Sequence, residues 1–230
     1  MSLRVFLCLA LTALTACSTA RMARPPSLVQ DSVSYEVTEM PGVFSKGDVV
    51  FGPYKATNIS RSWVNSSSSG WTIGDTRYAD NETSQDYSYR FNGNSIWKGD
   101  CRAAKGHSEV SIVAGGFYVD LSCTFEPIGS TASPWRFSFK GDRSDRATGL
   151  INLGSKTVTV GAIDRVESSP FKLAYNTGYY FYMDEQIFAA VDTISKEGPV
   201  WMNKSLTQEE RDKVAMVAVA FLLNQTNFDN

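Results

Sequence analysis

The feature that most constrains the fold is a run of ten consecutive apolar residues, Val214 to Leu223, near the end of the 230-residue chain. The residues before it predict a helix start, because Thr207 can cap a helix and Glu210, three residues on, completes a capping box. A helix that is apolar on every side must be buried on every side, and ten residues are too few to cross a bilayer, which takes about 20. We therefore expect a helix over about 207–224 that packs hard against a sheet or is threaded through a closed β-barrel.

Most of the chain before this helix has the pattern of short β-strands. Tyr87 to Phe91 alternates aromatic and polar side chains, which is typical of a strand with one apolar and one wet face. Asn92-Gly93, a strong hairpin signal, follows it, and Ser95 to Lys98 has the pattern of the return strand. Further strands are expected at 116–123 and near 48–57, 60–66, 134–140, 157–166, 171–175, 178–184, 186–194 and 199–203.

Strands at such even intervals favour a sandwich or a barrel. The length left after a leader and a tether fits one domain better than two. We predict a single, mainly β domain over 31–230, an antiparallel barrel or sandwich with one buried hydrophobic C-terminal helix. Within it, the polar run Ser66 to Gly70 is interpreted as a loop tip.

The order of elements over 171–225 resembles the tubby-like C-terminal fold shared by tubby, LURP and scramblase proteins. An aromatic strand, an Asp184-Glu185 turn, a second strand and a strand with Pro199-Val200-Trp201-Met202 precede the apolar helix. In that family a many-stranded barrel encloses a hydrophobic C-terminal helix, so the resemblance implies a closed barrel here. Some members bind phosphoinositides through basic residues. This sequence has no matching basic motif, so that activity does not carry over.

The N-terminus has the pattern of an export signal. Arg4 precedes an apolar stretch, Val5 to Leu11, that is too short to span a bilayer, and small residues follow, as in a secretory signal. Leu14-Thr15-Ala16-Cys17 resembles the lipobox of bacterial lipoproteins. The resemblance implies that residues 1–16 are removed as a signal peptide and that Cys17 carries diacylglycerol and a further acyl chain such as palmitate.

The resemblance also implies a location. Ser18 follows the cysteine, and in enterobacterial-type lipoproteins a residue other than aspartate there directs the protein to the outer membrane. We expect a lipid-anchored outer-membrane protein that faces the periplasm or the cell surface. Residues 17–30 contain Pro25-Pro26 and little periodicity. They are interpreted as the lipidated cysteine and a tether.

Two cysteines, Cys101 and Cys123, remain once Cys8 and Cys17 are accounted for. An even pair in an oxidising compartment predicts a disulfide, which for a loop of this length stabilises the fold by about 3 kcal/mol. The pair is not expected to bind zinc, because His107 is the only histidine of the chain and the spacing fits no zinc pattern. No metal and no cofactor is expected.

Charge and motifs exclude several function classes. The formal net charge is −2, and −3 once residues 1–16 are removed, so nucleic acid is not an expected partner. The Gly149 to Thr157 segment imitates a phosphate-binding loop, but Ser155 separates the second glycine from Lys156, so a hairpin turn is expected instead. Asp142-Arg143-Ser144-Asp145 lacks the glycine and glutamate of a calcium loop. Asp184 and Glu185 are adjacent and therefore do not converge as a catalytic pair.

Catalytic residues thus stay unknown. No Gly-x-Ser-x-Gly motif is present, and His107, in Lys105-Gly106-His107-Ser108, is expected in a turn. The aromatic residues are expected mainly in the core, although Tyr179 to Tyr182 must place rings on both faces of a strand.

Three functions remain open. The first is a non-enzymatic lipoprotein anchored in the membrane through Cys17 that binds an envelope protein, lipid or glycan. The second is an envelope hydrolase acting on lipid or glycan. The third is a β-barrel that binds a small ligand in an open interior.

Overall fold

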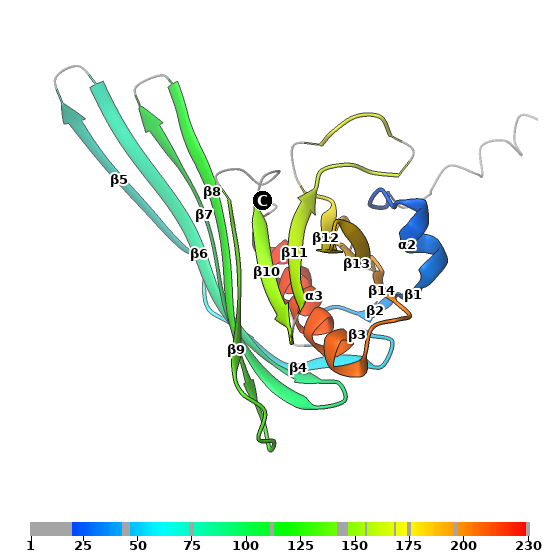
Figure 1. Cartoon of the computed structure of the whole chain (residues 1–230). Coiled ribbons are helices and arrows are strands. Elements are labelled where there is room, and N and C mark those ends of the chain that lie inside the picture. Colours follow the sequence, from blue (N-terminus) through cyan, green and yellow to red (C-terminus); the bar gives the residue numbers. More distant parts are fainter. Residues whose placement is uncertain are drawn as a thin grey trace, which may run out of the picture.

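The computed structural model describes residues 20–42, 47–73, 76–110, 113–141, 147–154, 156–167, 169–173, 176–195 and 197–228 (Figure 1). The predicted signal peptide, Cys17 and Ser18 lie outside these residues. The Asp142 to Asp145 segment and Ser155 lie outside them as well.

The described residues form one large antiparallel sheet, and the prediction of a mainly β fold is confirmed. The strands are β1 (Ser32–Tyr35), β2 (Val37–Glu39), β3 (Val49–Phe51), β4 (Tyr54–Arg61), β5 (Asn65–Ile73), β6 (Thr76–Asn92), β7 (Ile96–Val110), β8 (Val113–Pro127), β9 (Trp135–Gly141), β10 (Thr148–Leu153), β11 (Lys156–Ile163), β12 (Gly178–Met183), β13 (Gln186–Asp192) and β14 (Val200–Asn203). Their order in the sheet is β1-β14-β13-β12-β11-β10-β9-β8-β7-β6-β4-β3-β2, and β5 pairs with β6 outside this path.

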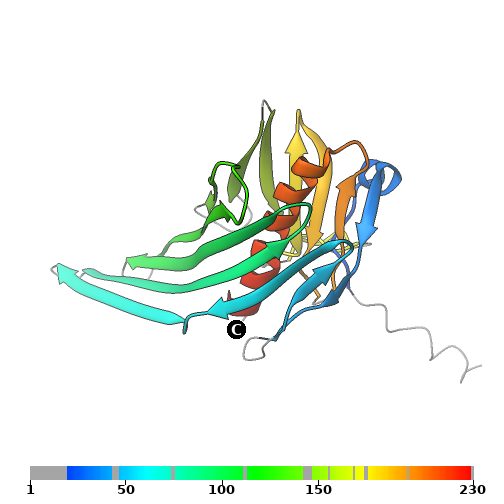
Figure 2. The same ribbon diagram turned by 90° about the horizontal axis from the view of Figure 1, so that it is seen from below.

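A short N-terminal segment closes this sheet into a nearly complete barrel. Strands β1 and β2 are separated only by Glu36, yet β1 pairs with β14 and β2 pairs with β3. The two ends of the strand order are therefore joined by consecutive residues of the chain. Figure 2 shows the resulting barrel wall around the C-terminal helix.

The C-terminal helix α3 (Gln208–Phe228) fills the barrel. Its apolar run, Val214 to Leu223, is at most 1% exposed, so the prediction of a helix buried on every side is confirmed. The predicted capping box is also present: the Thr207 N–H donates to Glu210 Oε2 at 2.8 Å, and the Glu210 N–H donates to Thr207 Oγ1 at 3.3 Å. The four orphan N–H groups of a helix start are thereby partly satisfied.

Aromatic side chains from the barrel wall hold the helix in one position. Tyr87 and Tyr89 of β6 point inward, and their hydroxyls donate to the carbonyl oxygens of Ala220 and Met216 at 2.8 and 2.7 Å. Burial raises the pKa of both hydroxyls well above the ordinary value. The Phe221 ring stacks on Tyr179 with centroids 3.7 Å apart. The helix therefore has a defined rotation inside the barrel as well as a defined depth.

The predicted disulfide is confirmed. Cys101 of β7 and Cys123 of β8 are direct partners in the strand register, with Cα atoms 4.1 Å apart. Both cysteines are 5% exposed or less and contact the barrel core. The bond thus fastens two neighbouring strands where they form part of the barrel wall.

Strands β6, β7 and β8 continue beyond the barrel and, with β5, form a projecting four-stranded sheet that we call the arm (Figure 1). Every residue of β5 is exposed. The interpretation of Ser66 to Gly70 as a loop tip is therefore wrong, since these residues lie within β5 and pair with β6 from Thr83 to Ala79. The hydrophobic pattern missed this strand because neither of its faces is buried.

The N-terminal residues differ from a free tether over their described part. Met22 is fully buried, and its N–H donates to Asp192 Oδ2 at 2.9 Å. The short helix α2 (Pro26–Asp31) follows, with Leu28 buried. Met22 and Leu28 form a small apolar cluster with Ile163, Ala190 and Trp201 on the outside of the barrel wall. These contacts hold residues 22–31 against the domain.

The expected turns and strands are largely present. Asn92 and Gly93 begin the β6–β7 hairpin, and the glycine-flanked β10–β11 connection is a hairpin with Gly154 at a φ of +64°. Asp184 and Glu185 form the β12–β13 turn. The strand expected near 171–175 is not formed by its described residues, 171–173, where Lys172 makes a single bridge to Arg165, and residues 174 and 175 lie outside the described part.

Candidate functional site

The interior of the barrel is occupied by its own helix. The side chains of Val214 to Leu223 and the inward-facing residues of the wall form one continuous apolar cluster. A packed core therefore occupies the described part of the barrel interior where a lipocalin-type ligand would bind, and the candidate site described next lies on the outer face.

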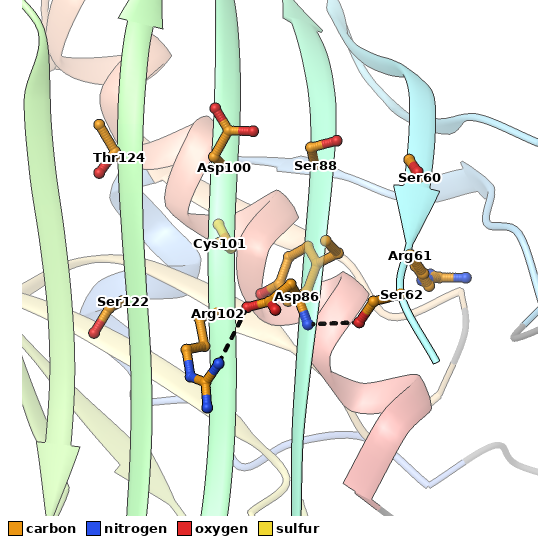
Figure 3. A pocket seen from close by; sticks show the side chains of 11 residues that line it. Ser60, Arg61, Ser62, Asp86, Ser88, Asp100, Cys101, Arg102, Ser122 and Thr124 are labelled. Carbon is orange, nitrogen blue, oxygen red and sulfur yellow. Dashed lines mark hydrogen bonds and ion pairs between the residues drawn. The ribbon is translucent and has the colours of Figure 1, made fainter. Parts of the chain in front are cut away.

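A shallow depression lies on the outer face where the arm meets the barrel, and we call it the root depression (Figure 3). Its volume is about 610 Å³. The side chains on its surface are Ser60, Ser62, Asp86, Ser88, Asp100, Arg102, Ser122 and Thr124, while Arg61, Tyr87 and Cys101 lie beneath. Strands β4, β6, β7 and β8 supply these residues, apart from Ser62, which directly follows β4. Alternate side chains of a strand point to the same face.

Charged residues of both signs meet in the root depression. Arg102 is the central cation: its guanidinium lies 3.4 Å from Glu82 Oε1 and 3.7 Å from Asp86 Oδ1. Asp100 pairs with Lys98 at 2.8 Å, and this hydrogen bond raises the pKa of the Lys98 ammonium. These groups are about half exposed, so each pair contributes little stability. They remain accessible to a polar partner.

The rim of the depression is locked to β6 by hydrogen bonds. The Asp86 N–H donates to Ser62 Oγ at 3.0 Å, and the Ser62 N–H donates to the Asp86 carbonyl at 2.8 Å. Gln85, which is buried, donates from Nε2 to the Ser62 carbonyl at 2.8 Å. These bonds hold the segment between β4 and β5, which carries the 83% exposed Trp63.

Arg61 lies under the depression, near the Tyr87 hydroxyl. Its Nη1 donates to the Gly42 carbonyl at 3.1 Å, and burial lowers the pKa of its guanidinium. Within the described part of the chain its Nε and Nη2 have no hydrogen-bond partner. The depression thus has a half-buried positive charge below a surface of hydroxyls and carboxylates.

Two further buried carboxylates have structural roles. Burial raises the pKa of Asp192, which accepts from the N–H groups of Met22 and Ile194, both at 2.9 Å. Burial also raises the pKa of Asp212, which accepts from the Asn94 and Ser95 N–H groups and fixes the β6–β7 hairpin to α3. Asp212 also accepts from Gln208 Nε2 at 2.8 Å. The two carboxylates belong to different ends of the barrel. They do not form a convergent acid–base pair.

The candidate catalytic residues of the sequence are not brought together. His107 lies in β7, paired with Asn81 and Phe117, so the prediction of a turn is wrong. The side chains of residues 107–118 lie outside the described part. Asp184 and Glu185 are exposed in their turn, both with positive φ. Across the described ranges no group of three or more His, Cys, Asp or Glu side chains could hold a metal ion.

Most of the aromatic side chains lie in the core, as the sequence suggests, and the exposed exceptions include two tryptophans on or next to the arm. Tyr179 and Phe181 face the core, while Tyr180 on the other face is half-buried and its hydroxyl donates to the Ala23 carbonyl. Trp63 and Trp71 are exposed by 83% and 48%.

The sequence pattern could have found part of the root depression. The alternation at Tyr87 to Phe91 already places Ser88 on the wet face, and extending it one step adds Asp86. What joins these residues to Arg102 is the strand register, which the sequence does not show.

Comparisons with known proteins give no relative. No family model matches the chain, and no curated protein or solved structure is significantly similar to it. None of the helices in the described ranges is long and apolar enough to cross a membrane.

Proposed function

We propose that this chain is a lipid-anchored protein of the cell envelope that binds a partner protein on the outer face of its arm, without catalysis. The observation that carries the proposal is the arm itself. It is a sheet whose edge strand β5 is exposed at every residue, while the interior of the barrel is filled by α3.

The composition of the arm supports a protein partner. The edge strand β5 buries no residue, whereas an ordinary sheet packs at least one face against a core. The outer face combines hydroxyls with charges of both signs around Arg102. A polar surface of this kind is compatible with a non-obligate protein interface, whose overall composition resembles that of the rest of the surface.

The position of the free edge adds to this support. One edge of β5 pairs with β6, and none of the strands in the described part of the chain pairs with its other edge. An open edge can add a strand from another chain. Serine-rich composition and the absence of long aliphatic residues from 65–70 keep that edge from being a strong aggregation site.

Export and anchoring rest on separate observations. The Cys101–Cys123 disulfide is of the kind that persists in oxidising compartments. The anchor rests on the resemblance of Leu14-Thr15-Ala16-Cys17 to a lipobox. We propose the outer membrane as the location because Ser18 follows that cysteine.

The anchor is tested by intact-mass spectrometry of protein taken from its native membrane, beside a Cys17→Ser form. We expect a mass that begins at residue 17 and includes acyl chains, and we expect that mass to be lost in the variant. An unlipidated mass would refute the anchor.

The binding surface is tested by photocrosslinking in living cells. A benzoylphenylalanine at Ser67 or Asp86, on the outer face of the arm, should give the same protein adduct. The matched control is Thr159, which is exposed on the outer face of β11. We expect Arg102→Glu to abolish the adduct. Equal adducts at Thr159, or a persistent adduct in Arg102→Glu, would contradict the proposal.

A further inference from the structure

The antiparallel order places several exposed apolar residues at the end of the barrel from which the N-terminus leaves. Successive strands from β6 to β14 run in opposite directions, so the connections before β6, β8, β12 and β14 lie at one end, uppermost in Figure 1. Met22 bridges to Val166 in the β11–β12 connection and bonds to Asp192 at the end of β13. The N-terminal segment therefore leaves the barrel at this upper end.

The N-terminal segment is fixed there by several contacts. The Glu167 N–H donates to the Arg21 carbonyl at 2.8 Å, and the Ala23 N–H donates to the Arg165 carbonyl at 2.9 Å. The Arg24 guanidinium contacts Glu167 Oε1 at 2.7 Å. Cys17 precedes Ala20 by three residues, which span about 10 Å when extended. A lipid on Cys17 would hold the upper end of the barrel close to the bilayer.

The connection that receives this segment carries an exposed aromatic ring. Phe171 is 75% exposed. Its neighbour Lys172 bridges to Arg165, an exposed residue whose carbonyl binds the N-terminal segment. Lys172 pairs with Asp164 at 2.9 Å, so the charges of this connection are largely balanced. A large exposed ring there is typical of a surface that meets a membrane, because aromatic rings favour the interface.

The tip of the arm carries a second exposed apolar group at the same end. Ile73, the last residue of β5, is 66% exposed. Trp71 stacks on Tyr78 across the β5–β6 ladder, with centroids 5.5 Å apart and planes 5° apart. Tryptophan and tyrosine are the side chains enriched at membrane interfaces.

The arm extends well beyond the neighbouring barrel wall at this end. The pairing of β8 with β9 begins at Val119, so the six residues of β8 from 113 to 118 extend past that neighbour. At the usual rise of a strand they project about 20 Å.

We propose that the arm tip, through Trp71 and Ile73, and the Phe171 connection both enter the interface of the bilayer that holds the lipid of Cys17. The protein then contacts the membrane at three places, which are the lipid of Cys17, the arm tip and the Phe171 connection, instead of at the lipid alone. This inference rests on the proposed anchor and names a lipid bilayer as the occupant of both apolar sites. The three contacts fix the orientation of the barrel and present the root depression at a set height above the membrane.

Exposed aliphatic residues elsewhere provide controls. Ile128 is 38% exposed at the lower end, just after β8, and Leu150 is 58% exposed on the wall at β10. Neither lies at the end where the N-terminus leaves.

The test uses the full lipoprotein in vesicles of phosphatidylethanolamine and phosphatidylglycerol. Single cysteines at Ile73, Phe171 and Ile128 carry an environment-sensitive nitrobenzoxadiazole label, with the Cys101–Cys123 disulfide intact. We expect nitroxide lipids to quench the labels at 73 and 171 at least threefold more than the label at 128. Iodide in the water phase should show the reverse order. Equal quenching at all three sites, or quenching at 171 alone, would overturn the inference.

A second experiment distinguishes failure of this inference from failure of the proposed anchor. Flotation of the vesicles reports the anchor by itself. If the native protein does not float, a form in which a His-tag replaces residues 1–17 is held on nickel-chelating lipids, and the same labels are measured. Quenching at 73 and 171 there supports the inference although the anchor has failed, and its absence overturns it. Protection of position 73 only after an envelope extract is added would indicate a protein occupant and would also overturn it.

Discussion

The barrel and the arm are built from the same strands, β6, β7 and β8, but they are stabilised in different ways. In the barrel half of β6, Tyr87, Tyr89 and Phe91 are at most 3% exposed and pack against α3. In the arm, β5 buries no residue at all. The barrel is held by apolar burial, whereas the arm is held by its backbone ladder, by polar contacts such as Arg102 with Glu82 and, near the barrel, by buried small residues such as Ala104.

This difference teaches where the protein tolerates change. Core substitutions are costly because they leave cavities or unpaired polar groups, whereas exposed positions usually shift stability by less than about 0.5 kcal/mol. Residues of the arm are therefore free to be selected for binding. The following four predictions test the comparison.

The largest effect is expected from Ala218→Asp in α3. Ala218 is fully buried, so the variant places an unpaired charge in the core, and removing the compensation of a buried charge costs about 3–5 kcal/mol. Urea denaturation followed by circular dichroism measures the loss. Thr159→Asp, which adds the same charge outside the barrel, is the control. If the two variants were equally stable, the helix would not be enclosed.

The next effect is expected at the junction of barrel and arm. Replacing Cys101 and Cys123 by alanine should lower the free energy of unfolding by about 3 kcal/mol, because the bond restricts the unfolded chain. Denaturation of the variant is compared with that of the native protein with and without reductant. A loss seen in the variant but not on reduction would show that packing of the sulfur atoms, and not the bond, is responsible.

A smaller effect is expected at the start of α3. Thr207→Ala removes the hydroxyl that accepts from the Glu210 N–H and should cost about 1 kcal/mol. Thr207→Ser, which keeps the hydroxyl, should restore most of the stability. Failure of serine to do so would mean that the loss comes from the methyl group of threonine.

The smallest effect is expected in the arm. Ser67→Asp should change the unfolding free energy by less than about 0.5 kcal/mol, because Ser67 is exposed and lies far from the core. Thermal unfolding measures the change, with the structurally matched barrel variant Thr159→Asp beside it. A loss of more than 2 kcal/mol would show that the arm depends on buried contacts and would remove the contrast with the barrel.

Several parts of the fold were predictable because local chemistry decides them. The run Val214 to Leu223 has no polar face, so it had to be enclosed. The capping box at Thr207 and Glu210 needs only residues three apart, and the turn at Asn92-Gly93 needs only two adjacent residues. Cys101 and Cys123 were the remaining pair. Each of these predictions depends on neighbours in the chain or on elimination, and each is confirmed.

The candidate site was predictable only in part. Ser88 lies on the wet face of an alternating strand, but the meeting of Asp86, Asp100 and Arg102 depends on the register of β6 with β7. The strand at Ser66 to Gly70 was missed because a strand with two exposed faces has no hydrophobic period. Met22 was assigned to a tether because its burial depends on Asp192, 170 residues away.

By itself, then, the sequence determined a β-rich domain, its buried capped helix, its disulfide and the resemblance to an export and lipidation signal. Tertiary structure alone decided that β6 to β8 extend beyond the barrel and that residues 22–31 pack against it. It also decided that Phe171, Trp71 and Ile73 lie at the end of the barrel from which the N-terminus leaves. The physical reason is the range of the interactions. Capping, turn chemistry and side-chain periodicity act between near neighbours, while strand register and docking join residues that only the closed sheet brings together.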